Sequence, residues 1–246
     1  MLGRQHLMLS VSTASVMIIP LIEKLDGFLT LITVGVVIGS LIPDVDASDA
    51  TVFHKNVKGL PGRTGQVVNM TIAPILPFFG YSTKYLIYKP AVTLFKMFLR
   101  GYSFRDGHRT FSHSFLGVFI MTAATGLYLA PPLIYIGLMS LPHLAAFLAG
   151  YFFGALMHML QDSCTKSGIA WNAPFSDTKL KGKLKTGKDN REPRFLFYIF
   201  MMQIPGILYL VLHTPSTAIN SFLVSLAAVS VTWTVFVFGV AEAKFT

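Results

Sequence analysis

The sequence predicts an all-α, polytopic membrane helical bundle with about six transmembrane helices. Of its 246 residues, 53% are hydrophobic and only 13% are charged, whereas soluble domains usually carry about 25% charged residues. The mean hydropathy is +0.60, and the apolar residues gather in segments of a length suited to a bilayer. The single cysteine, Cys164, excludes an internal disulfide. We therefore expect one membrane domain over residues 1–246.

Six apolar segments account for this prediction. The first is short and follows a basic start, as a signal peptide would, but no small-residue cleavage site precedes the charged turn at residues 23–26, so we interpret it as a retained helix. The fourth contains Pro142 in its middle, which predicts a kink. The last two form a C-terminal hairpin within residues 195–246. The six segments are residues 7–22, 28–43, 115–130, 133–158, 195–213 and 218–240.

Two basic connections interrupt these segments. Residues 44–111 contain two apolar pieces, residues 67–81 and residues 85–99, and the second mixes apolar side chains with lysines. That composition is typical of an amphipathic helix lying in the membrane interface, and a re-entrant hairpin of both pieces is the alternative. Residues 176–194 are rich in Lys, Gly, Asn and Pro, which predicts a solvated basic loop.

The distribution of Lys and Arg predicts the orientation in the membrane. If the six helices alternate, both termini and both basic connections share one side, and of the 20 Lys and Arg residues only Lys24 falls on the other. By the positive-inside rule the shared side is cytoplasmic. We expect an integral protein of the inner (plasma) membrane with both termini in the cytoplasm. Because orientation explains the net charge of +9, we expect no nucleic-acid partner.

The same alternation brings His and Asp residues to the cytoplasmic ends of the helices. If the fourth helix continues far enough, the i, i+4 spacing of His158 and Asp162 sets both on one face. Asp44 and Asp46 would share one side of an extended chain. Ionisable groups at the end of an apolar helix are costly unless they are paired, hydrated or bound to an ion. The candidate metal ligands are His6, Asp44, Asp46, His108, His113, His158 and Asp162.

A set of His and Asp ligands without thiolates indicates which metal to expect. It suits zinc first, with manganese or iron as alternatives, and suits magnesium less because magnesium prefers oxygen ligands alone. The excess of ligands over four accommodates one or two ions. The ordinary alternative is a hydrogen-bonded polar network, in which His158 and Asp162 only stabilise the end of a helix.

Three motifs resemble those of the YdjM-like membrane-bound, metal-dependent hydrolases. That family carries an early His, then L-P-D-x-D, then G-H-R-G-x-T-H-S, then H-x-x-x-D followed by T-x-x-G. The matching segments here are His6, residues 39–46, residues 107–114, residues 154–162, and the pair Thr165 and Gly168. The resemblance covers residues 6–175, which we treat as the metal-site core (residues 1–175).

The sequence departs from the family pattern at three positions. Ala47 stands where His often follows the second Asp, so one possible ligand is missing. Thr110 replaces a common Gly, and Ser112 replaces Thr. The first difference bears on a full two-metal site, whereas the other two are mild.

The resemblance implies hydrolase chemistry at the membrane surface. We expect a metal-dependent hydrolase, phosphoesterase or phospholipase-like, that cleaves a phosphoester of a lipid or lipid-like substrate. Metal-activated water would attack, Asp44 or Asp162 would act as general base, and Arg109 would stabilise negative charge on a phosphoryl oxygen. Arg109 is otherwise a topological charge. The alternative is a non-enzymatic membrane protein, either a metal-dependent scaffold or a transporter, although only His143 is predicted to lie deep in the membrane.

Overall fold

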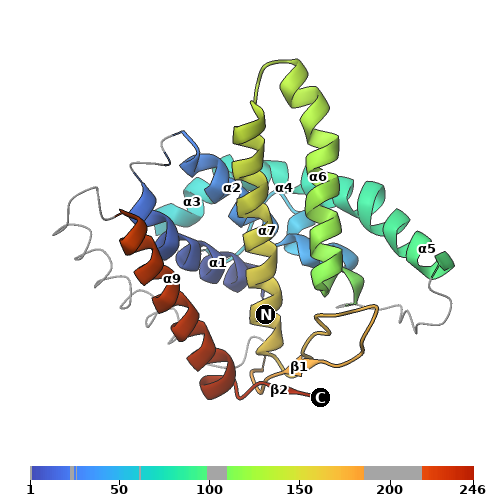
Figure 1. The fold of residues 1–246 in the computed structure, drawn as a ribbon. Helices are drawn as coiled ribbons and strands as arrows, with labels where there is room; N and C mark the ends of the chain where they lie inside the picture. The colour runs from blue at the N-terminus through green and yellow to red at the C-terminus, as the bar shows by residue number, and fades with distance from the viewer. Residues whose placement is uncertain (1, 23–24, 26, 61, 99–109, 186–217) are drawn as a thin grey trace.

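The computed structural model describes residues 2–22, 25, 27–60, 62–98, 110–185 and 218–246. Most of this part of the chain is helical (Figure 1). Three of the described helices are long and apolar enough to cross a membrane. They are α6 (Phe115–Tyr135), α7 (Leu141–Ser163) and the C-terminal helix over Phe222–Val240. The helical membrane class is therefore confirmed, with three candidate spans where six were predicted.

The first two predicted spans form shorter helices. α1 (Gly3–Ile18) has 16 residues and continues into the 3-10 turn η1 (Ile19–Leu21), and α2 (Leu29–Gly39) has 11. At 1.5 Å per residue, α1 reaches about 24 Å and α2 about 17 Å, less than a hydrocarbon core of about 30 Å. The predicted span at residues 195–213 lies outside the described residues.

The hairpin of α6 and α7 differs from the prediction. The sequence placed Pro142 in the middle of a span over residues 133–158, but α7 begins one residue before Pro142. The turn between the helices contains Gly137, with φ of +71°. In the first turn of a helix the missing N–H of proline costs no hydrogen bond. The predicted kink is therefore wrong, and His143 lies near the end of the hairpin instead of deep within a span.

Glycines bring α2 and α7 into backbone contact. A Cβ atom added at Gly35 or Gly39 of α2, or at Gly150 or Gly154 of α7, would lie 2.0–2.3 Å from a carbonyl oxygen of the other helix. Each helix thus carries glycines four residues apart, the spacing that lets membrane helices approach closely. This contact holds the C-terminal end of α2, and the residues that follow it, against α7.

The first connection folds as a series of helices. It contains α3 (Gly62–Thr71), the 3-10 turn η4 (Ala73–Ile75), and then α4 (Leu76–Ser82), the π-helical η5 (Thr83–Tyr88) and α5 (Lys89–Phe98) in one run. This run packs on the hairpin, since Ser82 Oγ lies 3.1 Å from the hydroxyl of Tyr128 on α6. α5 has no buried residue and projects from the body of the molecule (Figure 1).

The C-terminal helix returns to the start of the chain. α9 (Ala218–Thr234) continues into the π-helical η8 (Val235–Val240), which confirms the helix predicted over residues 218–240. Trp233 packs against α1, where its Nε1 donates to Thr13 Oγ1 at 3.2 Å. The strand β2 (Lys244–Phe245) then pairs antiparallel with β1 (Leu180–Lys181). A strand pair therefore occupies part of the predicted solvated loop.

Candidate metal centre

Five of the predicted ligands lie together. His6 comes from α1, Asp44 from the 3-10 turn η2 (Ile42–Asp46), and His113 from the 3-10 turn η6 (Phe111–His113), while His158 and Asp162 share one face of α7. Four of these side chains are at most 1% exposed, and that of Asp44 is 19% exposed. Of the five, Asp44 therefore faces the opening of the site.

Two imidazoles face the same two carboxylates. His113 Nε2 lies 3.5 Å from Asp44 Oδ1 and 3.6 Å from Asp162 Oδ2. His158 Nε2 lies 3.5 Å and 3.7 Å from the same two oxygens. Ligand atoms around tetrahedral zinc, with bonds of about 2.0–2.2 Å, lie about 3.3–3.6 Å apart, whereas charge-assisted hydrogen bonds measure about 2.7–2.9 Å. Each of these four distances fits a pair of ligand atoms around a metal ion better than a direct hydrogen bond.

The imidazoles of His158 and His6 are oriented through Nδ1. His158 Nδ1 lies 2.7 Å from the backbone carbonyl oxygen of Ser40, which can only accept. His6 Nδ1 lies 2.8 Å from Gln161 Oε1, and the amide nitrogen of Gln161 donates to Ser10 Oγ at 3.0 Å. In both rings Nδ1 therefore carries a proton, and in the neutral imidazole Nε2 offers a lone pair to the site. Such outer hydrogen bonds commonly fix the tautomer of metal-binding histidines.

His113 is oriented in the same way by a serine and an acid. Ser112 Oγ donates to Asp46 Oδ2 at 2.9 Å and lies 3.1 Å from His113 Nδ1, from which it accepts. Asp46 thus lies behind His113, whereas Asp44 lies in front of it. The predicted extended conformation, with Asp44 and Asp46 on one side, is wrong because η2 is a 3-10 helix. Residues two apart in a 3-10 helix point in different directions.

This arrangement suits a cation. Neutral imidazoles with protonated Nδ1 direct Nε2 lone pairs at carboxylates, and burial strengthens that repulsion. Among the described residues, His158 Nε2 has no hydrogen-bond partner. Burial raises the pKa of Asp44, but a positive charge on His158 and hydrogen bonding with His113 and His158 outweigh it and hold that pKa well below its usual value, so protonated imidazoles are the alternative to a metal ion between these groups. The ionised carboxylate suits a metal ion, and the donor set fits one.

His6 extends the site on the far side of Asp162. Its Nε2 lies 3.5 Å from Asp162 Oδ1, and its ring stacks on that of His158 with centroids 3.7 Å apart. Two ligand groups result, each with ligand atoms within 4.8 Å of one another: His6 with Asp44 and His158, and His113 with His158 and Asp162. Because the groups share His158, the prediction of one or two ions stays open at this geometry.

The remaining predicted residues are distributed as follows. His108 and Arg109 lie outside the described residues. The metal-ligand role of His108 and the phosphate-binding role of Arg109 therefore stay predictions. Thr165 and Gly168 follow the site, as the motif predicts: Thr165 Oγ1 donates to the carbonyl of Asp162 at 2.7 Å, and Gly168 has φ of +56°. They end α7 and turn the chain back beneath it.

Sequence reasoning missed several residues that position the ligands. Ser40 and Gln161 orient imidazoles, and Trp171 Nε1 donates to Ser163 Oγ at 2.8 Å, which ties the chain after the turn to the end of α7. The paired glycines of α2 and α7 were a visible signal, because both helices carry G-x-x-x-G in the sequence. Nothing in the sequence marks a backbone carbonyl such as that of Ser40 as an imidazole partner.

The fold and the site together define an integral membrane protein whose helix ends carry buried His and Asp residues suited to a metal ion. The family model described as YdjM inner membrane protein matches residues 1–241. The chain therefore belongs to the YdjM inner membrane protein family. No curated protein and no solved structure matches it.

Proposed function

We propose that this protein is a membrane-embedded, metal-dependent hydrolase that cleaves a phosphoester of a lipid or lipid-like substrate at the cytoplasmic membrane surface. The observation that carries the proposal is the convergence of imidazole Nε2 lone pairs and carboxylates. Every imidazole in the group is oriented from behind by its Nδ1 atom. Neutral imidazoles gain nothing from lone pairs that face carboxylates unless a cation lies between them.

The ligands have separable roles. His113, His158 and Asp162 form one ligand group that would hold an ion, and His6, Asp44 and His158 form the other. A divalent ion bound there supplies Lewis acidity, which activates water near neutral pH and polarises the bond to be cut. Asp44 is the partly exposed ligand, so it lies where incoming water would reach the ion.

A cavity lined by basic side chains supports an anionic substrate. It has a volume of about 610 Å³ and lies between the start of α1 and the segment 49–59. Arg4 and Lys58 line it, with Asp49 as its one acid. Because the site also lies at the end of apolar α7, a phosphoester carried by a lipid is the class of substrate that fits both features.

Elemental analysis of the detergent-purified protein tests the metal. Wild type should carry zinc, manganese or iron in stoichiometric amount, and His158→Ala and Asp162→Ala should lose it. His143→Ala is the matched control, because it removes the same imidazole from the other end of α7 and should retain the metal. Equal metal content in all four proteins, or none in wild type after metal is added back, would exclude this site.

Hydrolysis is tested separately with the metal that is found. Wild type should release phosphate or a phosphorylated product from phospholipid or from a soluble phosphoester, and Asp162→Ala should not. A protein that binds metal stoichiometrically at these residues but hydrolyses neither substrate class would contradict the enzyme proposal. The metal would then belong to a scaffold or transport role.

A further inference from the structure

The segment after α7 has a strict two-residue alternation. It reads Lys-Leu-Lys-Gly-Lys-Leu-Lys over residues 179–185. Leu180 is 6% exposed and Leu184 is fully buried, whereas Lys183 and Lys185 are exposed. Side chains alternate between the two faces of an extended strand. One face of this strand therefore packs on the protein, and the other is a row of lysines.

The C-terminal strand completes this surface. Ala241 and Ala243 are buried, whereas Glu242 and Lys244 alternate with them and are exposed. Backbone hydrogen bonds join the two strands from Lys183 N, which donates to the Ala241 carbonyl, to Lys179 N, which donates to the Thr246 carbonyl. We name this surface the lysine ribbon. It consists of Lys179, Lys181, Lys183, Lys185, Glu242 and Lys244.

Most of the positive charge on the lysine ribbon has no ion-pair partner among the described residues. Lys183 pairs with Glu242. Lys181 lies directly opposite Lys244 in the antiparallel register, a like-charge pair that destabilises a sheet. Among the described residues, Lys179, Lys181, Lys185 and Lys244 form no ion pair. A strand pair that places cations opposite one another is stabilised by an anion that both of them contact.

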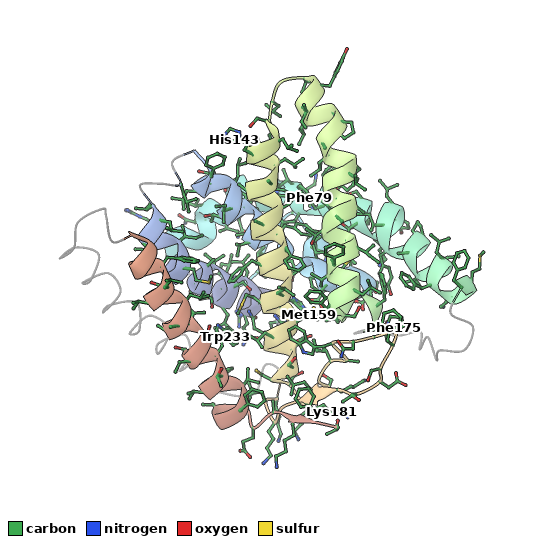
Figure 2. All side chains as sticks on the ribbon, viewed as in Figure 1. Phe79, His143, Met159, Phe175, Lys181 and Trp233 are labelled. Atoms are coloured by element: carbon green, nitrogen blue, oxygen red, sulfur yellow. The ribbon has the colours of Figure 1, made fainter. Side chains whose placement is uncertain are left out.

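The position of the lysine ribbon indicates where that anion comes from. Leu184 N donates to the carbonyl of Cys164, the residue after α7, and the Ala241 carbonyl that accepts from Lys183 follows η8 directly. The ribbon is thus joined to the ends of two candidate membrane spans, beneath which Figure 2 labels Lys181. Phe245, next to Lys244, is 69% exposed, so a large apolar side chain lies beside the lysines.

The geometry points to an anionic-lipid binding surface: the lysine ribbon contacts the headgroup phosphates of the membrane leaflet into which α7 and η8 lead. This surface is distinct from the metal centre and does not depend on its chemistry. The positive-inside rule accounts for lysines on this side of the membrane. It does not account for two of them placed opposite one another in a strand pair.

Native mass spectrometry in a neutral detergent measures this binding. Phosphatidylglycerol should bind more tightly than phosphatidylcholine, and inorganic phosphate at the same concentration should not compete. A lysine near an anionic membrane surface contributes about fivefold in affinity. Lys181→Gln with Lys244→Gln should therefore weaken phosphatidylglycerol binding about 25-fold. Replacing both lysines with arginine should preserve it.

One control variant separates the ribbon from net charge. Lys55→Gln with Arg63→Gln removes two exposed cations elsewhere and should bind phosphatidylglycerol as wild type does. If the Lys181 and Lys244 double variant binds as tightly as wild type, or if the Lys55 and Arg63 variant loses as much, the inference is wrong.

Discussion

Gly39→Ala is expected to weaken metal binding although Gly39 touches no metal ligand. An added Cβ would lie 2.0 Å from the carbonyl oxygen of Tyr151. Real Cβ contacts are essentially never shorter than 3.0 Å, so the backbones of α2 and α7 must separate locally by about 1.0 Å. Gly39 is adjacent to Ser40, whose carbonyl accepts from His158 Nδ1 at 2.7 Å. The same separation would lengthen that hydrogen bond to about 3.7 Å, beyond its working range.

Two magnitudes follow from this displacement. Losing an outer hydrogen bond to a metal-binding histidine typically weakens metal affinity about 10–100-fold, and overpacking costs about 1–3 kcal/mol in the free energy of unfolding. A competition titration against a chelating dye measures the first, and thermal unfolding in detergent measures the second. Gly239→Ala is the matched control, because the nearest atom to its Cβ would lie at 3.9 Å. Unchanged affinity in Gly39→Ala would refute the role given to the helix contact.

Four further outcomes are expected. Ser112→Ala removes the acceptor of His113 Nδ1 and should lower metal affinity about tenfold in the same titration. Trp171→Phe deletes the hydrogen bond to Ser163 and should cost about 0.5–1.5 kcal/mol in thermal unfolding while metal content stays constant. Folding lowers the pKa of Asp44 from its ordinary value of 3.8, so its carboxylate stabilises the fold at any pH above 3.8. This stabilisation is lost as the pH falls through the folded-state pKa. Acid unfolding followed by circular dichroism should show that Asp44→Asn lacks this loss. A chelator should lower the melting temperature of wild type by removing a ligand of the native state, and added metal should restore it.

Composition and hydropathy were sufficient for the class of fold but not for the lengths of its helices. An apolar run shows which residues avoid water, and packed protein satisfies that preference as well as lipid does. The run at residues 28–43 was predicted as a span, yet its helix ends at Gly39 and the rest becomes the turn that carries Asp44. An apolar run that passes through Pro142 predicts a kink there, but proline equally favours the first turn of a new helix.

The position of the His and Asp residues at helix ends predicts that they lie together, but it does not predict the role of each. The i, i+4 spacing predicted the shared face of His158 and Asp162, which α7 confirms. The alternation of spans predicted that His6 and Asp44 would reach the same level, and both lie within the ligand group. Roles depend on backbone geometry that composition does not encode. A 3-10 turn, and not the identity of the residue, places Asp46 behind an imidazole while Asp44 lies among the ligands.

The depth of the site separates two of the proposed roles. An ion path through a membrane needs acidic groups near the bilayer midplane. Here Asp44 belongs to the turn after α2 and Asp162 to the last turn of α7. Asp44 is the ligand that reaches solvent. His143, once expected to be deep, lies in the first turn of α7 instead. With the carboxylates of the site at one end of α7, a substrate that arrives at one membrane surface fits the described residues better than an ion that crosses between two.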